Sequence, residues 1–369
     1  MIVKSRTESF NRSRIDRLRF SFSALNVDAF LVSHLPNIRY LCGFTGSAAL
    51  LLVEESSATL FTDSRYAFQA REEVSHAQIK IAKEGLIRAA GDALRKRRGR
   101  GRERVGYNPA QFTVAQLSAI QRAASGRVRW IDGGNAVEKL RAVKDAGELA
   151  LMTEAAVLIS AVVEETLSSI RPGVTELEVA ADLEYGMKRK GASGASFETI
   201  VAAGPHSAWA HARPTSNPLR KSQLVVLDQG VILRGYCSDM TRTVFLGRAP
   251  ASVRRLYRAV LAAEEAAKAA IKPGVSGESV DAAARCVLKR ERLVQYFTHS
   301  TGHGLGLEVH EMPRLGRGEK TTLEEGMVVT VEPGVYVEGL GGIRIEDDVV
   351  VTATGCRVLT TTLRDFLEL

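Results

Sequence analysis

The sequence predicts two domains, an N-terminal α/β domain over residues 1–132 and a C-terminal α+β domain over residues 133–369. Three observations support this prediction. Helix-like and strand-like patterns alternate over the first 130 residues, long helices and β-hairpins occupy the rest, and one segment of the second part recurs 101 residues later. A chain of 369 residues is also long enough for two domains of ordinary size.

In the N-terminal part, apolar residues at helical spacing predict helices, and runs rich in β-branched or aromatic residues predict strands. The predicted helices cover 12–25, 66–74, 86–96 and 112–124, and the predicted strands cover 28–33, 48–54, 58–62, 79–82, 104–106 and 128–131. Such alternation is typical of a compact α/β domain. The turn sequence 132-DGGN-135 then marks the expected linker.

The predicted helices of the second part are longer and cover 146–169, 175–190, 252–271 and 276–292. Two segments, 172-PGVTELEVAADLEYGMKRKG-191 and 273-PGVSGESVDAAARCVLKRER-292, match at seven of twenty positions, and each precedes a β-type stretch. Both open with Pro-Gly-Val and a hydroxyl residue, which reads as a turn and a helix N-cap. The similarity has two explanations, a chance likeness of helix starts or a duplicated half-domain with a pseudo-two-fold axis and a site at its centre.

Composition limits the classes of function. The run 95-RKRRGRGRER-104 accounts for +6 of the net charge of +8, and it contains no aromatic residue on which a base could stack. We therefore expect a solvated surface segment and no nucleic-acid partner. The four cysteines form no CxxC pair, the N-terminus has no apolar signal region, and no run approaches the length of a membrane helix. These features favour a cytoplasmic protein without a membrane segment.

Four carboxylates occupy strand-like positions where an isolated charge is costly. Asp228 ends one apolar strand and Asp239 begins the next, while Glu332 and Glu346 lie in or beside two later strands. Each residue alone could cap a turn, and Glu346 could simply pair with Arg344. Four such groups in one domain are more than salt bridges comfortably explain, so we consider a metal centre.

Histidines support the metal centre, because the stretch 298-THSTGHGLGLEVHE-311 holds three of the seven in the chain. Several carboxylates with one imidazole are typical of a dinuclear centre, and two divalent cations balance four carboxylates. A donor set rich in oxygen favours Mn²⁺, with Co²⁺ or Zn²⁺ as alternatives.

These residues resemble the five-ligand set of the "pita-bread" (M24) metallopeptidases, which include methionine aminopeptidase, prolidase and aminopeptidase P. The N-terminal part resembles the creatinase/prolidase N-terminal domain. The resemblance covers nearly the whole chain, and the segments that carry it are LDQGVILRGYCSDMTRT, HSTGHGLGLEVHE, VEPGVY, GIRIEDD, 36-PNIRYLCGFTGS-47 and 61-FTDSRY-66.

The resemblance implies a role for each member of the set. Asp228 would chelate one metal ion, Asp239 and Glu346 would bridge both, and His303 and Glu332 would complete the second. Glu332 would also relay a proton to the leaving amine. We expect the glycines beside His303 to let the backbone approach the centre.

Other residues match positions around the substrate. His211 and His310 would contact the substrate and its developing oxyanion, although Ala210 stands where proline often precedes the first of them. His299 would support the ligands or serve as a structural hydrogen-bonding residue. Arg344 would orient Glu346 or bind substrate.

The resemblance implies hydrolysis of the Xaa-Pro bond at peptide N-termini, and a homodimer. We expect an aminopeptidase P, which acts on longer peptides; the alternative is an Xaa-Pro dipeptidase (prolidase). The quoted motifs are common to both enzymes, which differ in how the N-terminal domain closes the pocket beyond proline. A non-catalytic pita-bread binding protein is a remote alternative, because such proteins usually have an eroded ligand set. A serine hydrolase is disfavoured because GxSxG is absent from the sequence.

Overall fold

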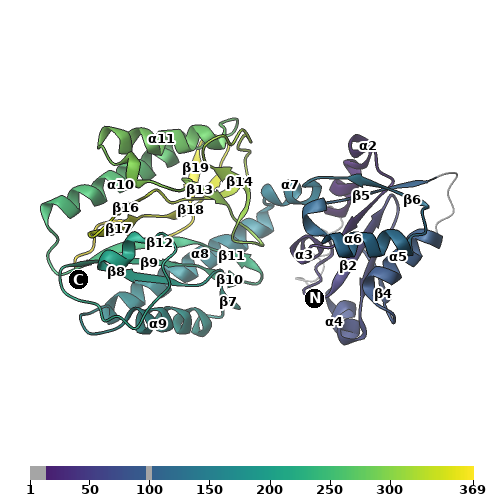
Figure 1. Cartoon of the computed structure of the whole chain (residues 1–369), viewed down its shortest axis with the longest axis horizontal. Coiled ribbons are helices and arrows are strands. Elements are labelled where there is room, and N and C mark those ends of the chain that lie inside the picture. The colour runs from purple at the N-terminus through teal and green to yellow at the C-terminus, as the bar shows by residue number, and fades with distance from the viewer. Residues whose placement is uncertain (1–13, 97–101) are drawn as a thin grey trace. The chain divides into compact units, whose positions relative to one another are not determined.

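The computed structural model describes residues 14–96 and 102–369 (Figure 1). These residues form two compact units, which divide between Arg141 and Ala142. Part of the basic run, residues 97–101, lies outside the described residues. The predicted turn at 132–135 is followed by helix α7 (Ala136–Ala142), and the division between the units falls at the end of this helix.

The N-terminal unit is built on a six-stranded mixed sheet with the order β4-β3-β2-β1-β5-β6. All six strands were predicted: β1 (Ala29–Val32), β2 (Ala49–Glu54), β3 (Ala58–Thr62), β4 (Gln78–Ile81), β5 (Glu103–Tyr107) and β6 (Val128–Asp132). The structure also describes helical residues at 14–20 and the helices α2 (Phe22–Leu25), α3 (Leu35–Cys42), α4 (Ala67–Glu73), α5 (Leu86–Lys96) and α6 (Val114–Ala123).

Helix α3 was missed because its first turn contains Pro36 and Asn37, which read as a turn signal. Proline is well tolerated in the first turn of a helix, where its missing N–H has no partner to lose. The apolar residues that follow, including Ile38 and Leu41, are fully buried. Packing therefore overrides the weak local preference of this segment.

The C-terminal unit contains four long helices and several antiparallel sheets. Its first half contains α8 (Ala146–Thr166), α9 (Glu176–Arg189), β7 (Gly194–Ala195), β8 (Ile200–Ala203), β9 (Gln223–Gln229), β10 (Val231–Leu233), β11 (Tyr236–Cys237) and β12 (Met240–Leu246). Its second half contains α10 (Ala251–Ala270), α11 (Gly277–Arg290), β13 (Gly302–Gly304), β14 (Glu311–Leu315), β15 (Val328–Val331), β16 (Gly334–Val337), β17 (Gly341–Arg344), β18 (Asp347–Val351) and β19 (Cys356–Val358).

Two sheets form the centre of this unit, one with the order β12-β9-β8 and one with the order β14-β13-β15-β18-β19. Figure 1 shows α8 and α9 on one side of these strands and α10 and α11 on the other. One apolar core joins α8 and α9 to the first sheet, and a second joins α10 and α11 to the second sheet.

The repeated segments build the same local structure twice, which supports duplication over chance. Thr175 and Ser276 are the N-caps of α9 and α11, and both cap through their hydroxyl groups. Gly173 N–H donates to Leu219 O at 2.9 Å, and Gly274 N–H donates to Leu323 O at 2.9 Å. The C-terminal unit is thus a pair of related halves.

Helix α8 corrects one expectation from the sequence. Among the residues that the structure describes, Ala146–Ser169 is the one helix long and apolar enough to cross a membrane by length and composition. The expectation that no run approaches this length was therefore wrong here. However, Ile159, Val162 and Val163 are buried against α9 and the first sheet. Core helices of globular proteins pass the same test, and we assign this helix to the core.

Candidate metal centre

The first two carboxylates are brought together by the pairing of β9 and β12. Asp228 lies near the end of β9 and pairs with Thr241 of β12, while Asp239 lies two residues before Thr241. Side chains along a strand alternate with a period of two, so both carboxylates face the same side of the sheet. The hairpin therefore places Asp228 and Asp239 at one edge of the site.

The second half supplies the other three predicted ligands. His303 lies in β13, Glu332 directly follows β15, and Glu346 lies between β17 and β18. The neighbouring strands also require the glycines beside His303. A Cβ atom at Gly302 would lie 1.9 Å from Thr330 O, and one at Gly304 would lie 2.2 Å from Met312 O. The glycines thus let β13 fit between its neighbouring strands.

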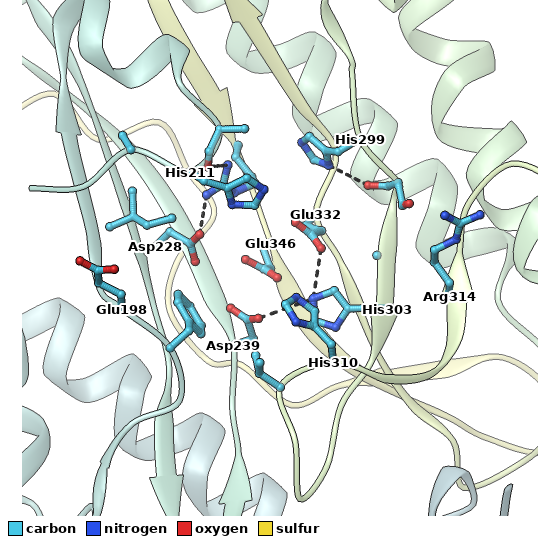
Figure 2. Close-up of a pocket in the computed structure, with 18 of the residues that line it drawn as sticks. Glu198, His211, Asp228, Asp239, His299, His303, His310, Arg314, Glu332 and Glu346 are labelled. Atoms are coloured by element: carbon cyan, nitrogen blue, oxygen red, sulfur yellow. Dashed lines mark hydrogen bonds and ion pairs between the residues drawn. The ribbon is translucent and has the colours of Figure 1, made fainter. Parts of the chain in front are cut away.

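All nine predicted site residues line one cavity of about 660 Å³, a volume that is ordinary for a small-ligand site (Figure 2). They are Asp228, Asp239, His303, Glu332, Glu346, His211, His310, His299 and Arg344. Ligand atoms of Asp239, His303 and Glu346 lie within 4.8 Å of one another, close enough to hold a metal ion. Glu332 joins them, since its Oε1 lies 3.4 Å from His303 Nε2.

Crowding of buried carboxylates has an electrostatic cost. Burial and the negative charges of Glu346 and Asp228 raise the pKa of Asp239 well above its usual range. Burial and the charges of Glu332 and Asp228 do the same to the pKa of Glu346. Burial raises the pKa of Glu332 to about 7, although the nearby Arg344 opposes the shift. A cation among these groups would remove the repulsion.

His303 gives a more specific indication of a cation. Its Nδ1 lies 3.0 Å from Gly304 O, so Nδ1 carries a proton and donates to this carbonyl. Burial lowers the pKa of His303, which favours the neutral ring. The lone pair of Nε2 then faces Asp239 Oδ2 at 3.8 Å and Glu332 Oε1 at 3.4 Å. A lone pair facing two carboxylate oxygens is repulsive unless a metal cation or an added proton lies between them, and a metal ion could contact all three atoms at once.

Two further atoms fit the same interpretation. The buried oxygens Asp228 Oδ1 and Asp239 Oδ1 have no hydrogen-bond donor in the structure. Buried carboxylate oxygens normally accept hydrogen bonds or bind a metal ion. The carboxylates and the imidazole therefore match the donor chemistry of a divalent metal site.

Arg344 has a different carboxylate partner from the one the sequence suggested. Its Nη2 pairs with Asp228, and its Nε donates to Thr241 Oγ1 at 3.0 Å. The Thr241 hydroxyl in turn donates to Glu346 Oε2 at 2.5 Å. The hydrogen-bond link from Arg344 to Glu346 therefore runs through Thr241. Sequence reasoning missed Thr241, although it lies only two residues after Asp239.

The remaining predicted histidines surround this group. The rings of His303 and His310 meet edge to face with centroids 4.4 Å apart. His299 Nε2 lies 2.9 Å from the hydroxyl of Tyr336, a residue that sequence reasoning also missed. His211 is exposed on the segment between β8 and β9, and Figure 2 shows it beside the pocket.

The chain matches two family models. Residues 150–353 match metallopeptidase family M24, and residues 14–143 match the creatinase/prolidase N-terminal domain. A similar solved structure is the Xaa-Pro dipeptidase from Bacillus anthracis, with 36% identity, a TM-score of 0.93, and coverage of 97% of this chain and 100% of that one. Another is the X-Pro aminopeptidase from Thermotoga maritima MSB8, with 35% identity, a TM-score of 0.87, and coverage of 96% and 99%.

A curated relative extends the match over full length. The Xaa-Pro dipeptidase of Pyrococcus furiosus is 32% identical over 360 residues, which cover 96% of this chain and 100% of that protein. Family models, full-length relatives and the arrangement of the carboxylates and His303 agree. The protein belongs to metallopeptidase family M24, carries the creatinase/prolidase N-terminal domain, and is a hydrolase.

Proposed function

We propose that the protein is an Xaa-Pro dipeptidase (prolidase) that works with two divalent metal ions. The sequence alone favoured an aminopeptidase P. The full-length relatives change this preference, because the Bacillus anthracis and Pyrococcus furiosus proteins are Xaa-Pro dipeptidases. The similarity to the Thermotoga maritima X-Pro aminopeptidase keeps aminopeptidase P as the second candidate.

The observation that carries hydrolysis is the lone pair of His303 Nε2 facing two buried carboxylates. We assign Asp228 to one metal ion, Asp239 and Glu346 to both, and His303 and Glu332 to the second. Oxygen-rich donors favour Mn²⁺, while Co²⁺ and Zn²⁺ are alternatives. When bound, such ions supply a Lewis acid and lower the pKa of a water molecule bound to them to about 7.

Residues of the chain supply the other parts of the reaction. His310 lies against His303 on the pocket wall, and burial, together with the neighbouring imidazoles of His303 and His211, lowers its pKa. A neutral His310 can donate a hydrogen bond to the substrate carbonyl as its oxygen becomes negative. We assign the same role to His211, which also lines the pocket. Glu332, the carboxylate nearest His303 Nε2, is assigned to pass a proton to the departing proline nitrogen.

Arg314 supports a dipeptide as the substrate. It lines the pocket on the side of His303, opposite Glu198 (Figure 2). In the part of the chain that the structure describes, Arg314 has no carboxylate within ion-pair distance, and its Nη2 donates to Arg317 O at 3.0 Å. An Xaa-Pro dipeptide presents a carboxylate directly after the proline ring, whereas a longer peptide presents an amide there. A cation at this place favours the shorter substrate.

A paired assay tests this proposal. The protein is loaded with Mn²⁺ and given Ala-Pro, Ala-Pro-Ala and Ala-Ala, and release of alanine is followed. Rapid cleavage of Ala-Pro alone is the expected result. Cleavage of Ala-Pro-Ala at a comparable rate would indicate aminopeptidase P instead. No cleavage of any peptide, with metal bound, would favour the non-catalytic binding protein.

Two further properties belong to the same proposal. We expect a homodimer because of the family resemblance, and measurement of the mass in solution by light scattering tests it. The four cysteines, which form no CxxC pair, are consistent with a cytoplasmic enzyme. Fractionation of cells that produce the protein tests this location.

A further inference from the structure

Glu176 is a buried carboxylate outside the metal centre, with 1% of its surface exposed. It is the first residue of α9 and faces the segment that joins β8 to β9. Glu176 Oε1 accepts from Ala203 N–H at 2.8 Å, and Oε2 accepts from Thr215 N–H at 2.9 Å and from the Thr215 hydroxyl at 2.7 Å. Nδ1 of His206 lies 2.9 Å from Oε1 and 3.0 Å from Oε2.

These bonds join the two ends of one loop. Ala203 ends β8 and Thr215 lies twelve residues later, and His211 lies between them. The backbone of α9 adds to the junction, because Leu177 N–H donates to Thr215 O at 3.1 Å. The loop is also held in its middle, where Arg344 Nη1 donates to Ala210 O at 3.2 Å. His211 itself is exposed, so its position depends on how the loop is held.

Glu176 is not needed to cap its helix. Thr175 and Glu178 already form a complete capping box at the start of α9, with Glu178 N–H donating to Thr175 Oγ1 at 3.1 Å. The bonds of the Glu176 side chain go to the loop instead. Burying a carboxylate is costly unless it is well bonded, so a structural role in the helix alone does not explain this residue.

We propose that Glu176 is a positioning residue for His211, and that it fixes the loop 203–215 so that the His211 ring faces the bound peptide. This inference rests on the proposed function, because His211 is assigned there to the substrate. Both oxygens of Glu176 accept hydrogen bonds from the loop. In Glu176→Gln, the side-chain NH₂ group would face a donor of either Ala203 or Thr215. Because two donors cannot form a hydrogen bond with each other, the variant opens one end of the junction.

A spectroscopic probe already exists in the loop. The chain has two tryptophans, and Trp209 lies two residues before His211. Trp209 is 69% exposed, and its ring meets the ring of His206 edge to face with centroids 5.2 Å apart. In a Trp130→Phe background, the fluorescence anisotropy of Trp209 reports the mobility of this loop alone.

The test compares Glu176→Gln with Glu178→Gln, both in the Trp130→Phe background. Glu178→Gln alters the same helix turn without touching the loop, so it controls for a loss of helix stability. For Glu176→Gln we expect a fall in kcat/KM for Ala-Pro of about tenfold or more, because a misplaced catalytic contact costs this much or more. Its Trp209 anisotropy should fall, while Glu178→Gln should keep kcat/KM within about twofold of the parent and leave the Trp209 anisotropy unchanged.

A double-mutant cycle separates positioning from general damage. If Glu176 acts through His211, adding Glu176→Gln to His211→Ala should cause no further loss of kcat/KM. Losses that multiply would overturn the proposal, and so would an unchanged anisotropy in Glu176→Gln. If Glu176→Gln fails to fold, Thr215→Val removes one of the same bonds and should show smaller changes in the same direction; no change would overturn the proposal.

The proposed function and this inference can fail separately. If the parent enzyme cleaves none of the peptides, the proposed function fails. The anisotropy of Trp209 still decides whether Glu176 holds the loop.

Discussion

Arg242 is the clearest place to test how the fold supports the metal centre. It is 4% exposed, and its guanidinium group uses all five N–H donors. Nη1 donates to Glu346 O at 2.6 Å and to Thr241 O at 2.9 Å, and Nη2 donates to Asp347 Oδ1 at 2.8 Å. The remaining donors bind carbonyl oxygens of the C-terminal segment. One side chain thus holds the backbone carbonyl of Glu346 and the side chain of the next residue, Asp347.

Arg242→Met keeps an unbranched apolar stem and removes this group. The change leaves buried Asp347 with Lys268, whose Nζ lies 2.9 Å from Asp347 Oδ2. Breaking a buried ion pair costs about 3–5 kcal/mol, and the remaining lysine places the loss near 3 kcal/mol. For a domain of this size each kcal/mol lowers Tm by about 2–4 °C, so Tm should fall by roughly 6–12 °C. Metal affinity should also fall, because Glu346 loses its backbone anchor.

Differential scanning calorimetry measures the first effect, and isothermal titration with Mn²⁺ measures the second. Arg255→Met is the matched control, because Arg255 forms an exposed ion pair with Glu291 at 3.2 Å. Exposed pairs contribute about 0–1 kcal/mol, so this variant should unfold close to the parent. If Arg242→Met lowers Tm no more than Arg255→Met and binds Mn²⁺ as tightly as the parent, the reasoning is wrong.

The other predictions concern the ligands, the substrate and pH. Asp239→Asn or His303→Ala should abolish turnover and lower the metal content measured by mass spectrometry; full metal and full activity in either variant would contradict the assignment. Arg314→Gln should raise KM for Ala-Pro by roughly tenfold and leave any weak cleavage of Ala-Pro-Ala unchanged, in steady-state kinetics. Burial and the charge of Asp347 raise the pKa of Glu264 from 4.5 to about 8, although Lys268 opposes the shift. The folded protein then binds a proton that the unfolded chain has lost, so Glu264 should reduce stability as the pH rises from about 4.5 to about 8. Chemical denaturation across this range should show a smaller decline in Glu264→Gln than in the parent.

The metal ligands could be predicted from the sequence because their charged side chains lie where the surrounding residues predict an apolar strand. Carboxylates such as Asp228 and Glu332 lie in or beside apolar strands, where a charge needs a special reason. The strands of the N-terminal domain were equally visible, because their apolar runs are bounded by turn residues. In both cases the signal lies within a few neighbouring residues.

The supporting residues could not be predicted in this way. Thr241 donates to Glu346, which is 105 positions away, and Tyr336 has no local feature that marks it for a contact with His299. Glu176 looked like an ordinary acidic residue in the first turn of a helix, where acids are favoured anyway. Its loop partners become visible only when the halves of the domain are folded.

The duplicated architecture shows why such a residue is needed. In the second half, buried Asp281 of α11 accepts from the Thr301 hydroxyl at 2.8 Å and from Arg285 Nε at 2.7 Å, just before His303. Each half therefore has a helix whose buried carboxylate fastens the segment that bears a site histidine. The two carboxylates are not equivalent in the repeat, because the 101-residue offset matches Glu176 with Gly277. The halves reach the same arrangement from different positions, which indicates a requirement of the site and not a relic of the duplication.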